Sequence, residues 1–311
     1  MAEEKYRLVT RSDFDGLVCA VLLKELDIIE EILFVHPKDM QDGTVEITAK
    51  DITTNLPYVA SCHLCFDHHA SEVKRAAGES RDNQIIDATA PSAARVVYDY
   101  YGGKKVFANI ADDMMEAVDK ADSAQFSESE ILEPKGWVLL NYLMDSRTGL
   151  GRFREFSISN YALMMELIDY CHSHTIDEIL ELPNVRERSE LYAEQSVLFE
   201  EQLKRCAKVH DNLVILDLRN EETIYAGNRF MIYALFKECN ISIHVIWGRD
   251  KANTVFAIGN SIVNRSSKTH VGELCLTYAG GGHQNAGTCQ IDNDDAQHVL
   301  DELIGKINAN G

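Results

Sequence analysis

Acidic residues follow short apolar segments at several places in the first seventy residues, and this arrangement constrains the fold more than any other feature. Apolar and β-branched content predicts strands over residues 6–10, 32–36, 44–52 and 62–66. A polar loop and a stretch with helical spacing, residues 17–26, follow the first strand. Strands that alternate with helices predict an α/β fold with a doubly wound, mostly parallel sheet. In such sheets ligands bind beyond the carboxyl ends of the strands.

Four carboxylates lie at or just past these predicted strand ends: Asp13, Asp15, Asp51 and Asp67. Asp67 leads directly into His68 and His69. Carboxylates that converge at one edge repel each other and raise each other's pKa values, unless cations hold them together. Asp and His side chains in an oxygen-rich set favour Mn²⁺ or Mg²⁺ over a thiolate-preferring ion. The sequence therefore predicts a divalent metal site at this edge of the sheet.

The second half of the chain predicts a second domain. Helical pattern dominates residues 137–206, and a β-rich section starts at 212–217 and continues through 241–247 and 254–258. We predict a metal-binding catalytic domain over residues 1–185, a connecting helix over 186–208, and a smaller C-terminal α/β domain over 209–311 that binds substrate. The catalytic cleft is expected between the two domains.

Charge and composition narrow the functions open to the chain. The 311 residues include 30 Lys and Arg against 50 Asp and Glu, a net charge of −20, which repels long nucleic acids and acidic membranes. No apolar run approaches the roughly 20 residues of a membrane span, and the first residues lack the pattern of a secretory signal. Eight scattered cysteines in a chain large enough for its own core indicate reduced thiols. We expect a cytoplasmic protein that binds no membrane.

In this order, the motifs resemble those of the DHH family of phosphoesterases with a DHH-associated C-terminal domain. That family includes RecJ-type exonucleases, nanoRNases that also hydrolyse pAp, and exopolyphosphatase-related proteins. The matching segments are Ser12–Gly16, Asp51 within 50–57, Phe66–His69, Asp122 within 119–123, and Gly280–Gly287. The resemblance covers nearly the whole chain, and the Asp-His-His triplet together with the distant glycine segment is its specific combination.

The resemblance implies a site for one or two ions of Mn²⁺ or Mg²⁺. The ligands it implies are Asp13 for one metal, Asp15, His68 and Asp122 for the other, and Asp51 as a bridge. Asp67 and His69 would lie behind the ligands, or His69 would hold a phosphate oxygen. Two metals about 3.5–4 Å apart can bind a phosphoryl oxygen and lower the pKa of a bridging water.

The chain departs from the family pattern just before the first acidic pair. Many members carry a metal-binding histidine there, whereas this chain has Val-Thr-Arg-Ser over residues 9–12. Arg11 is cationic and offers no acceptor, so it cannot ligate a metal. Three interpretations remain open: the first metal binds weakly, the Arg11 guanidinium partly replaces its charge and grips the substrate phosphate, or His36 supplies the missing ligand.

A second set of candidates lies in the C-terminal domain. The predicted substrate-binding residues there are Gly280, Gly281, Gly282, His283, Arg265 and Lys268. Consecutive glycines let backbone N–H groups approach an anion closely, and a histidine beside them can donate to a phosphate oxygen or protonate a leaving group. A guanidinium suits bidentate contact with phosphate. We predict that this cluster holds the far end of the substrate.

The sequence thus predicts a metal-dependent phosphoesterase in which metal-activated hydroxide attacks a phosphate ester or phosphodiester. The predicted catalytic residues are Asp67, His68, His69 and Arg11. The acidic surface favours short substrates, such as oligonucleotides of a few residues, pAp or linear dinucleotides. Two alternatives are an exopolyphosphatase acting on inorganic polyphosphate and a non-catalytic nucleotide-binding regulatory protein with an impaired first metal site. The oligomeric state stays open, with a homodimer as one option.

Overall fold

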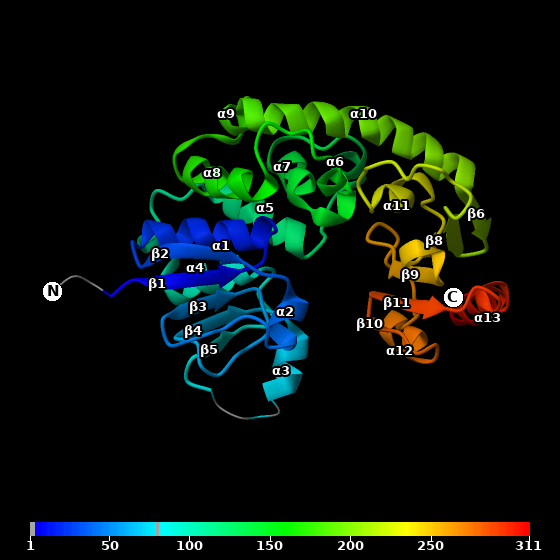
Figure 1. The fold of residues 1–311 in the computed structure, drawn as a ribbon, viewed down its shortest axis with the longest axis horizontal. Coiled ribbons are helices and arrows are strands. Elements are labelled where there is room, and N and C mark those ends of the chain that lie inside the picture. The colour runs from blue at the N-terminus through cyan, green and yellow to red at the C-terminus, as the bar shows by residue number, and fades with distance from the viewer. Residues whose placement is uncertain (1–3, 77, 79–80) are drawn as a thin grey trace. The chain divides into compact units, whose positions relative to one another are not determined.

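The computed structural model describes residues 4–76, 78 and 81–311, which form two compact units (Figure 1). The first unit comprises Met1–Gln125, Lys135–Ser146 and Gly151–Ser189, and the second comprises Phe126–Pro134, Arg147–Leu150 and Glu190–Gly311. The division falls inside the long helix α10 (Pro183–Cys206). The short segments 126–134 and 147–150 belong to the second unit, although the sequence analysis assigned them to the first domain.

The first unit is built around five strands and eight helices within its described residues. The strands are β1 (Tyr6–Thr10), β2 (Ile29–Phe34), β3 (Asp51–Thr54), β4 (Leu64–Asp67) and β5 (Gln84–Ile86). The helices are α1 (Phe14–Glu25), α2 (Pro37–Gln41), α3 (Ala70–Ala76), α4 (Ala93–Tyr100), α5 (Asp112–Asp122), α7 (Gly136–Met144), α8 (Asn160–Ser173) and α9 (Ile176–Leu180).

All pairs in the first sheet are parallel, in the order β2-β1-β3-β4-β5, which confirms the predicted α/β fold. Because β2 and β3 flank β1, the strand order reverses beside β1, and α/β proteins bind ligands at such a point. Helix α1 is apolar on all sides and buried from Phe14 to Leu23, since α4, α5 and α8 pack around it (Figure 1). Because the strands run parallel, the loop after β1 lies at the same edge of the sheet as the carboxyl ends of the other strands.

Strand β3 begins at Asp51, whereas the sequence analysis placed a strand over 44–52. The alternating residues Val45 and Ile47 do point into the protein, but they pack in a small cluster with Val35 and Met40 instead of joining the sheet. The true strand reads Asp-Ile-Thr-Thr, and every one of its residues is buried. Polar content thus concealed a central parallel strand, which is buried on both faces.

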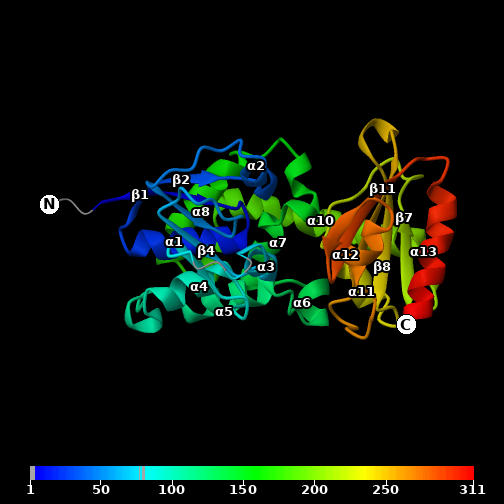
Figure 2. The ribbon, with the colours of Figure 1, turned by 90° about the horizontal axis from the view of Figure 1, so that it is seen from below.

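The second unit contains a mixed six-stranded sheet in the order β10-β11-β9-β8-β7-β6. Its strands are β6 (Ala207–His210), β7 (Leu213–Asp217), β8 (Ile241–Trp247), β9 (Thr254–Asn260), β10 (Gly281–His283) and β11 (Ala286–Ile291), and its helices are α6 (Glu128–Leu132), α11 (Met231–Leu235), α12 (Val271–Leu276) and α13 (Ala296–Asn310). Only β7 and β8 pair in parallel among these strands. Figure 2 shows α12 and α13 lying along this sheet.

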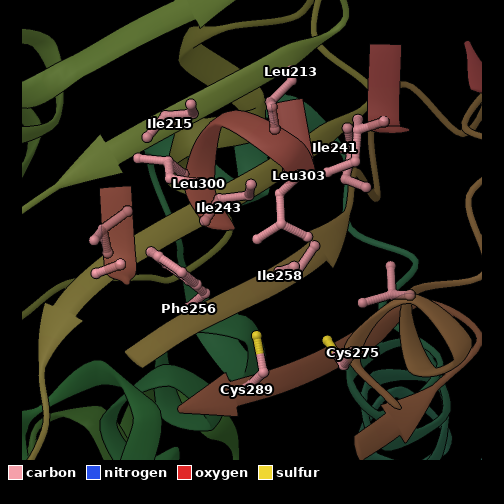
Figure 3. Packing of buried hydrophobic residues seen from close by; sticks show 14 residues of the cluster. Leu213, Ile215, Ile241, Ile243, Phe256, Ile258, Cys275, Cys289, Leu300 and Leu303 are labelled. Atoms are coloured by element: carbon pink, nitrogen blue, oxygen red, sulfur yellow. The ribbon is translucent and has the colours of Figure 1, made fainter. Parts of the chain in front are cut away.

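One apolar cluster holds the second unit together (Figure 3). Ile243 and Phe256 of the sheet meet Leu300 and Leu303 of α13, and Cys275 of α12 belongs to the same buried set. Both helices therefore cover one face of the sheet. Within the described residues, no helix has both the length and the apolar character needed to cross a bilayer.

Candidate active site

The loop after β1 begins the site. Asp13 caps the N-terminus of α1, because its Oδ1 accepts a hydrogen bond from the Gly16 backbone N–H at 3.0 Å. The loop folds so closely onto the helix that a Cβ at residue 16 would lie 1.9 Å from the Arg11 carbonyl oxygen. Glycine at this position is therefore a steric requirement. The turn fixes both acidic side chains of the motif beyond the strand.

Asp15 is buried, with 2% of its surface exposed. Its two oxygens accept hydrogen bonds from the backbone N–H groups of Ala93 at 3.0 Å and Ala94 at 2.8 Å, which open α4. Burial and the nearby Asp122 carboxylate raise the pKa of Asp15 well above its usual range. The N-terminus of α4 favours the charged carboxylate of Asp15, and a cation beside Asp15 would also favour the charged form.

The end of β4 carries the Asp-His-His triplet. Asp67 is 1% exposed, and its Oδ1 accepts from the backbone N–H of His68 at 2.8 Å and lies 2.7 Å from Nδ1 of His69. The carboxylate thereby holds the His69 ring in one orientation. Asp67 Oδ2 is buried without a hydrogen-bond partner among the described residues.

His68 turns its other ring nitrogen toward the carboxylates. Its Nδ1 lies 3.3 Å from the Ala90 carbonyl oxygen, which selects the tautomer with the proton on Nδ1 and leaves Nε2 as a ligand. Nε2 lies 2.8 Å from Asp122 Oδ2, yet it has no partner with hydrogen-bond geometry among the described residues. Two side chains that bind one metal ion would have their ligand atoms close together in this way, without a hydrogen bond between them. Burial lowers the pKa of His68, but Asp122, Asp15 and Asp67 outweigh burial and raise it to about 9.

Two groups of side chains bring three ligand atoms within 4.8 Å of one another: Asp15 with His68 and Asp122, and Asp67 with His68 and His69. The first group combines two carboxylates with an imidazole, a donor set that suits a divalent cation. A bound ion would give the buried Nε2 of His68 a partner, and it would lower the raised pKa of Asp15. These residues form a candidate metal site.

Metal binding at this site should depend on pH, because a cation must displace the proton that His68 holds below about pH 9. Displacement of one proton predicts that the Mn²⁺ affinity rises about tenfold per pH unit from pH 6.5 to 8. Calorimetric titration of the protein with Mn²⁺ at several pH values measures this slope. A flat profile would show that His68 is not a ligand.

Asp13 is held differently from Asp15. The Arg11 Nε lies 3.0 Å from Asp13 Oδ2, and the Asn55 amide nitrogen lies 3.3 Å from Asp13 Oδ1. Asp13 belongs to neither three-ligand group of the described residues. His36, the alternative ligand, instead caps α2 through its Nδ1, which accepts from the Lys38 backbone N–H at 3.1 Å.

Asp51 lies at the wrong end of its strand, and this corrects the bridging role expected for it. It is the first residue of β3, pairs with Arg7 at 2.6 Å, and accepts from the Thr48 backbone N–H at 2.6 Å. Four residues of strand span about 13 Å, so Asp51 cannot reach the opposite edge. Asn55, which follows β3 and contacts Asp13, occupies the strand-end position. Its placement after the true strand was the signal that the sequence analysis missed.

Replacement of Asp51 by asparagine should leave kcat unchanged and destabilise the fold. Burial raises the pKa of Asp51, but Arg7 and Thr48 outweigh burial and lower it, so the carboxylate is charged and bonded at neutral pH. Loss of these charge-assisted bonds should reduce the free energy of unfolding by about 1–3 kcal/mol. Urea unfolding and steady-state kinetics of Asp51→Asn measure both effects, and a collapse of kcat in a folded variant would restore Asp51 to the site.

The glycine segment of the second unit forms a tight hairpin. Gly281, Gly282 and His283 are β10, which pairs with β11, and a Cβ at Gly280 or Gly282 would lie 2.3 Å from a carbonyl oxygen of β11. A Cβ at Gly281 would meet no atom within 4 Å, so the backbone there is open to a close approach. Packing thus explains two of the glycines, and the exposed His283 follows the open one two residues along the same strand.

Arg265 and Lys268 lie on the exposed loop between β9 and α12. The Arg265 Nε donates to the Ile262 carbonyl at 3.0 Å. This loop meets the end of the glycine hairpin through Asn260, whose amide nitrogen lies 3.1 Å from the Thr269 carbonyl and 3.5 Å from the Gln284 carbonyl. The two cations and the glycine hairpin are therefore neighbouring features of the same unit.

Comparison with protein-family models finds no match, and comparison with curated proteins finds none either. Among solved structures, the pGpG-specific phosphodiesterase PggH from Vibrio cholerae is 62% identical, with a TM-score of 0.89 over 99% of this chain and 100% of that protein. CDC45 from Entamoeba histolytica, at 9% identity, covers 98% of this chain and 96% of its own with a TM-score of 0.53, a likeness of fold alone.

RecJ from Thermus thermophilus, solved with Mn²⁺, is 12% identical with a TM-score of 0.47, over 98% of this chain and 52% of that protein. The full-length similarity to PggH agrees with the order of the motifs along the chain and with the clustered side chains of Asp15, His68 and Asp122. The chain belongs to the DHH family of phosphoesterases, and it is a hydrolase of the phosphodiesterase type.

Proposed function

We propose that this enzyme hydrolyses the linear dinucleotide pGpG to two molecules of GMP, using a divalent cation. Water adds across the internal phosphodiester, so that one product gains the 3′-hydroxyl and the other the 5′-phosphate. The observation that carries the reaction class is the three-ligand group of Asp15, His68 and Asp122 at the carboxyl edge of the sheet. The substrate is inferred from the 62% identity with the pGpG-specific relative.

The metal-binding side chains in this proposal are Asp15, His68 and Asp122, and the ion is Mn²⁺ or Mg²⁺. When bound, such a cation polarises a phosphoryl oxygen and lowers the pKa of a water molecule. Asp15 is positioned by the first N–H groups of α4, and His68 by the Ala90 carbonyl, so the ligands need little rearrangement to bind. We assign one ion to this group.

Arg11 supplies positive charge where the family pattern has a metal-binding histidine. Its ion pair with Asp13 keeps the guanidinium beside the acidic loop, and more than a third of its side chain is exposed. A guanidinium in this place can bind a phosphate oxygen through two N–H groups. We infer that Arg11 takes over part of the charge of a weak or absent first ion.

His69 completes the phosphate contacts of the first unit. Asp67 holds its ring through Nδ1, and in the imidazolium form, in which both ring nitrogens carry protons, Nε2 donates to a phosphate oxygen. In the second unit, we assign substrate-binding roles to the open backbone at Gly281 and to the exposed side chains of His283, Arg265 and Lys268. Gly280 and Gly282 allow the hairpin to form.

The similarity to a phosphodiesterase over the full chain favours this function over both alternatives raised by the sequence. Inorganic polyphosphate would need a row of cations, and a purely regulatory protein would not need a clustered metal-ligand set. The reducing cytoplasm suits the chain, because all eight cysteines are free thiols in the structure.

A hydrolysis panel tests the proposal. The purified protein is incubated in Mn²⁺ with pGpG, pApA, pAp, a five-residue RNA and polyphosphate, and products are separated by chromatography. We expect two GMP per pGpG consumed, little turnover of the longer RNA, and none of polyphosphate. Asp15→Asn, which keeps the shape of the side chain, should abolish turnover. Polyphosphate as the best substrate, or turnover unaffected in Asp15→Asn, would refute the proposal.

A further inference from the structure

The six-stranded sheet of the second unit has a second face, opposite the apolar cluster. Ile243 and Phe256 belong to the cluster that α13 covers (Figure 3). His244 and Ala257 follow them in the chain, and successive side chains of a strand point to opposite faces. His244 and Ala257 therefore lie on the other face, where both are partly exposed.

The strand register puts four residues of this face in one line across the sheet. His244 of β8 is opposite Ala257 of β9. Ala257 is opposite Thr288 of β11, and Thr288 is opposite Gly281 of the edge strand β10. Directly opposed residues share a face, and neighbouring strands lie about 4.8 Å apart, so the line spans about 14 Å. These four residues are the cross-strand row.

The row is low along its length and bordered by larger side chains. Ala257 is small, Thr288 is exposed, and a Cβ at Gly281 would meet no atom within 4 Å. On one side, the Tyr233 hydroxyl covers Gly259, where a Cβ would lie 2.8 Å from it. The residues of the same face on the other side are Ile246, Val255 and Gln290. A flat ligand can therefore lie over the row between these borders.

His244 supplies a hydrogen-bonding group at the inner end of the row, where the next residue in line, Leu216, is buried. Burial and the positive charge of Arg229 lower the pKa of His244 to about 4. The ring is therefore neutral at neutral pH and offers one N–H donor and one acceptor nitrogen. Within the described residues, none forms a hydrogen bond with this ring. Polar groups in such enclosed places normally have a partner, and the edge of a nucleobase can supply one.

The groups along the row follow the order of the parts of a nucleotide. The open backbone at Gly281 lets N–H groups approach an anion closely, so the phosphate belongs at that end. The Thr288 hydroxyl comes next, in reach of a sugar. The neutral His244 ring at the other end suits an uncharged base, since it has no charge to attract a second phosphate.

We propose that the cross-strand row binds one mononucleotide of the substrate, with the phosphate at the Gly281 backbone, the sugar over Thr288 and Ala257, and the base hydrogen-bonded to His244. The proposal deepens the proposed function and rests on it for the substrate. It adds a base contact and a sugar contact, which neither the metal site nor the glycine hairpin supplies.

Calorimetry with the full-length protein in EDTA tests the base contact without turnover. GMP should bind at least about tenfold more tightly than ribose 5-phosphate, because only GMP brings a base to His244. His244→Leu should remove most of this advantage. His298→Leu should keep it, because His298 is exposed on α13, which covers the opposite face of the sheet. No GMP binding, equal affinity for the two ligands, or an unchanged advantage in His244→Leu would overturn the row.

A pair of exposed variants on β11 tests the row independently of the buried imidazole. Thr288→Glu places a carboxylate in the row, between the sites of the phosphate and the base, and should weaken GMP binding by at least about tenfold. Gln290→Glu adds the same charge to the same strand and face outside the row, and solvent screening should limit its effect to about threefold. An equal loss in both variants, or retained affinity in Thr288→Glu, would overturn the proposal. Failure of the wild type to hydrolyse pGpG would instead refute the proposed function, because GMP binding is measured without catalysis.

Discussion

Replacing His68 with alanine should lower kcat for pGpG by about 10³-fold, because the metal site loses its imidazole. A bound divalent ion contributes several kcal/mol to the stabilisation of the phosphoryl transition state, and about 4 kcal/mol corresponds to this factor. His68 is the one side chain shared by both three-ligand groups of the described residues, so no neighbour can replace it. Steady-state kinetics with pGpG at saturating Mn²⁺ measure the change.

The thermal midpoint distinguishes loss of metal from loss of fold. Mn²⁺ should raise the midpoint of the wild-type protein, since a ligand that binds only the folded state stabilises it, and it should not raise that of His68→Ala. His63→Ala is the matched control. His63 directly precedes β4, at the end of the strand away from His68, and its ring stacks on Tyr6 with the centroids 4.0 Å apart. If His68→Ala kept both its turnover and its Mn²⁺ shift, the assignment of the metal site would be wrong.

Replacing Arg11 with alanine should lower kcat/KM for pGpG by about 10²-fold, in line with removal of one positioned donor to a developing anion. The guanidinium is held beside the acidic loop, with its Nε 3.0 Å from Asp13 Oδ2. Arg11→His should act in the opposite sense on metal binding, because it restores a neutral ligand and removes a positive charge. We expect Arg11→His to bind Mn²⁺ more tightly than the wild type.

Kinetics and calorimetry of the two variants separate the interpretations of Arg11. If the guanidinium replaces the charge of a metal, Arg11→Ala loses activity and Arg11→His recovers part of it with added Mn²⁺. Arg186→Ala is the control, because Arg186 forms an exposed ion pair with Glu181 on the surface of the same unit. Unchanged affinity for Mn²⁺ and an unchanged rate in both Arg11 variants would remove Arg11 from the mechanism.

Much of the first unit follows from local pattern. The apolar strand before Asp13, the helix after it and the Asp-His-His triplet at the end of β4 are all recognisable in the sequence, because strand ends in a parallel sheet share one edge. Asp122 is different, since it ends α5 far along the chain and joins the site only through packing of α5 against α1 and α4. The family resemblance pointed to it, whereas periodicity did not.

The local sequence around β3 was misleading. Alternation over 44–48 resembles a strand, but Val45 and Ile47 pack in a cluster against β1 and β4 without joining the sheet, and the sheet takes up the polar segment that follows. A shift of the strand by several residues moved Asp51 to the far edge and brought Asn55 beside Asp13. Register depends on which segment the neighbouring strands accept, and that choice is made by contacts distant in sequence.

The sequence by itself determined the α/β class, the metal-binding chemistry and the reaction type, because these depend on residue types at strand ends and on their order along the chain. The tertiary structure decided which carboxylates lie together as candidate metal ligands, how Arg11 is held, and that the ends of β1, β2, α7 and the start of α8 line a cavity. Ligand distances and cavity walls arise where segments remote in sequence pack together, and their positions to within an ångström are set by that packing.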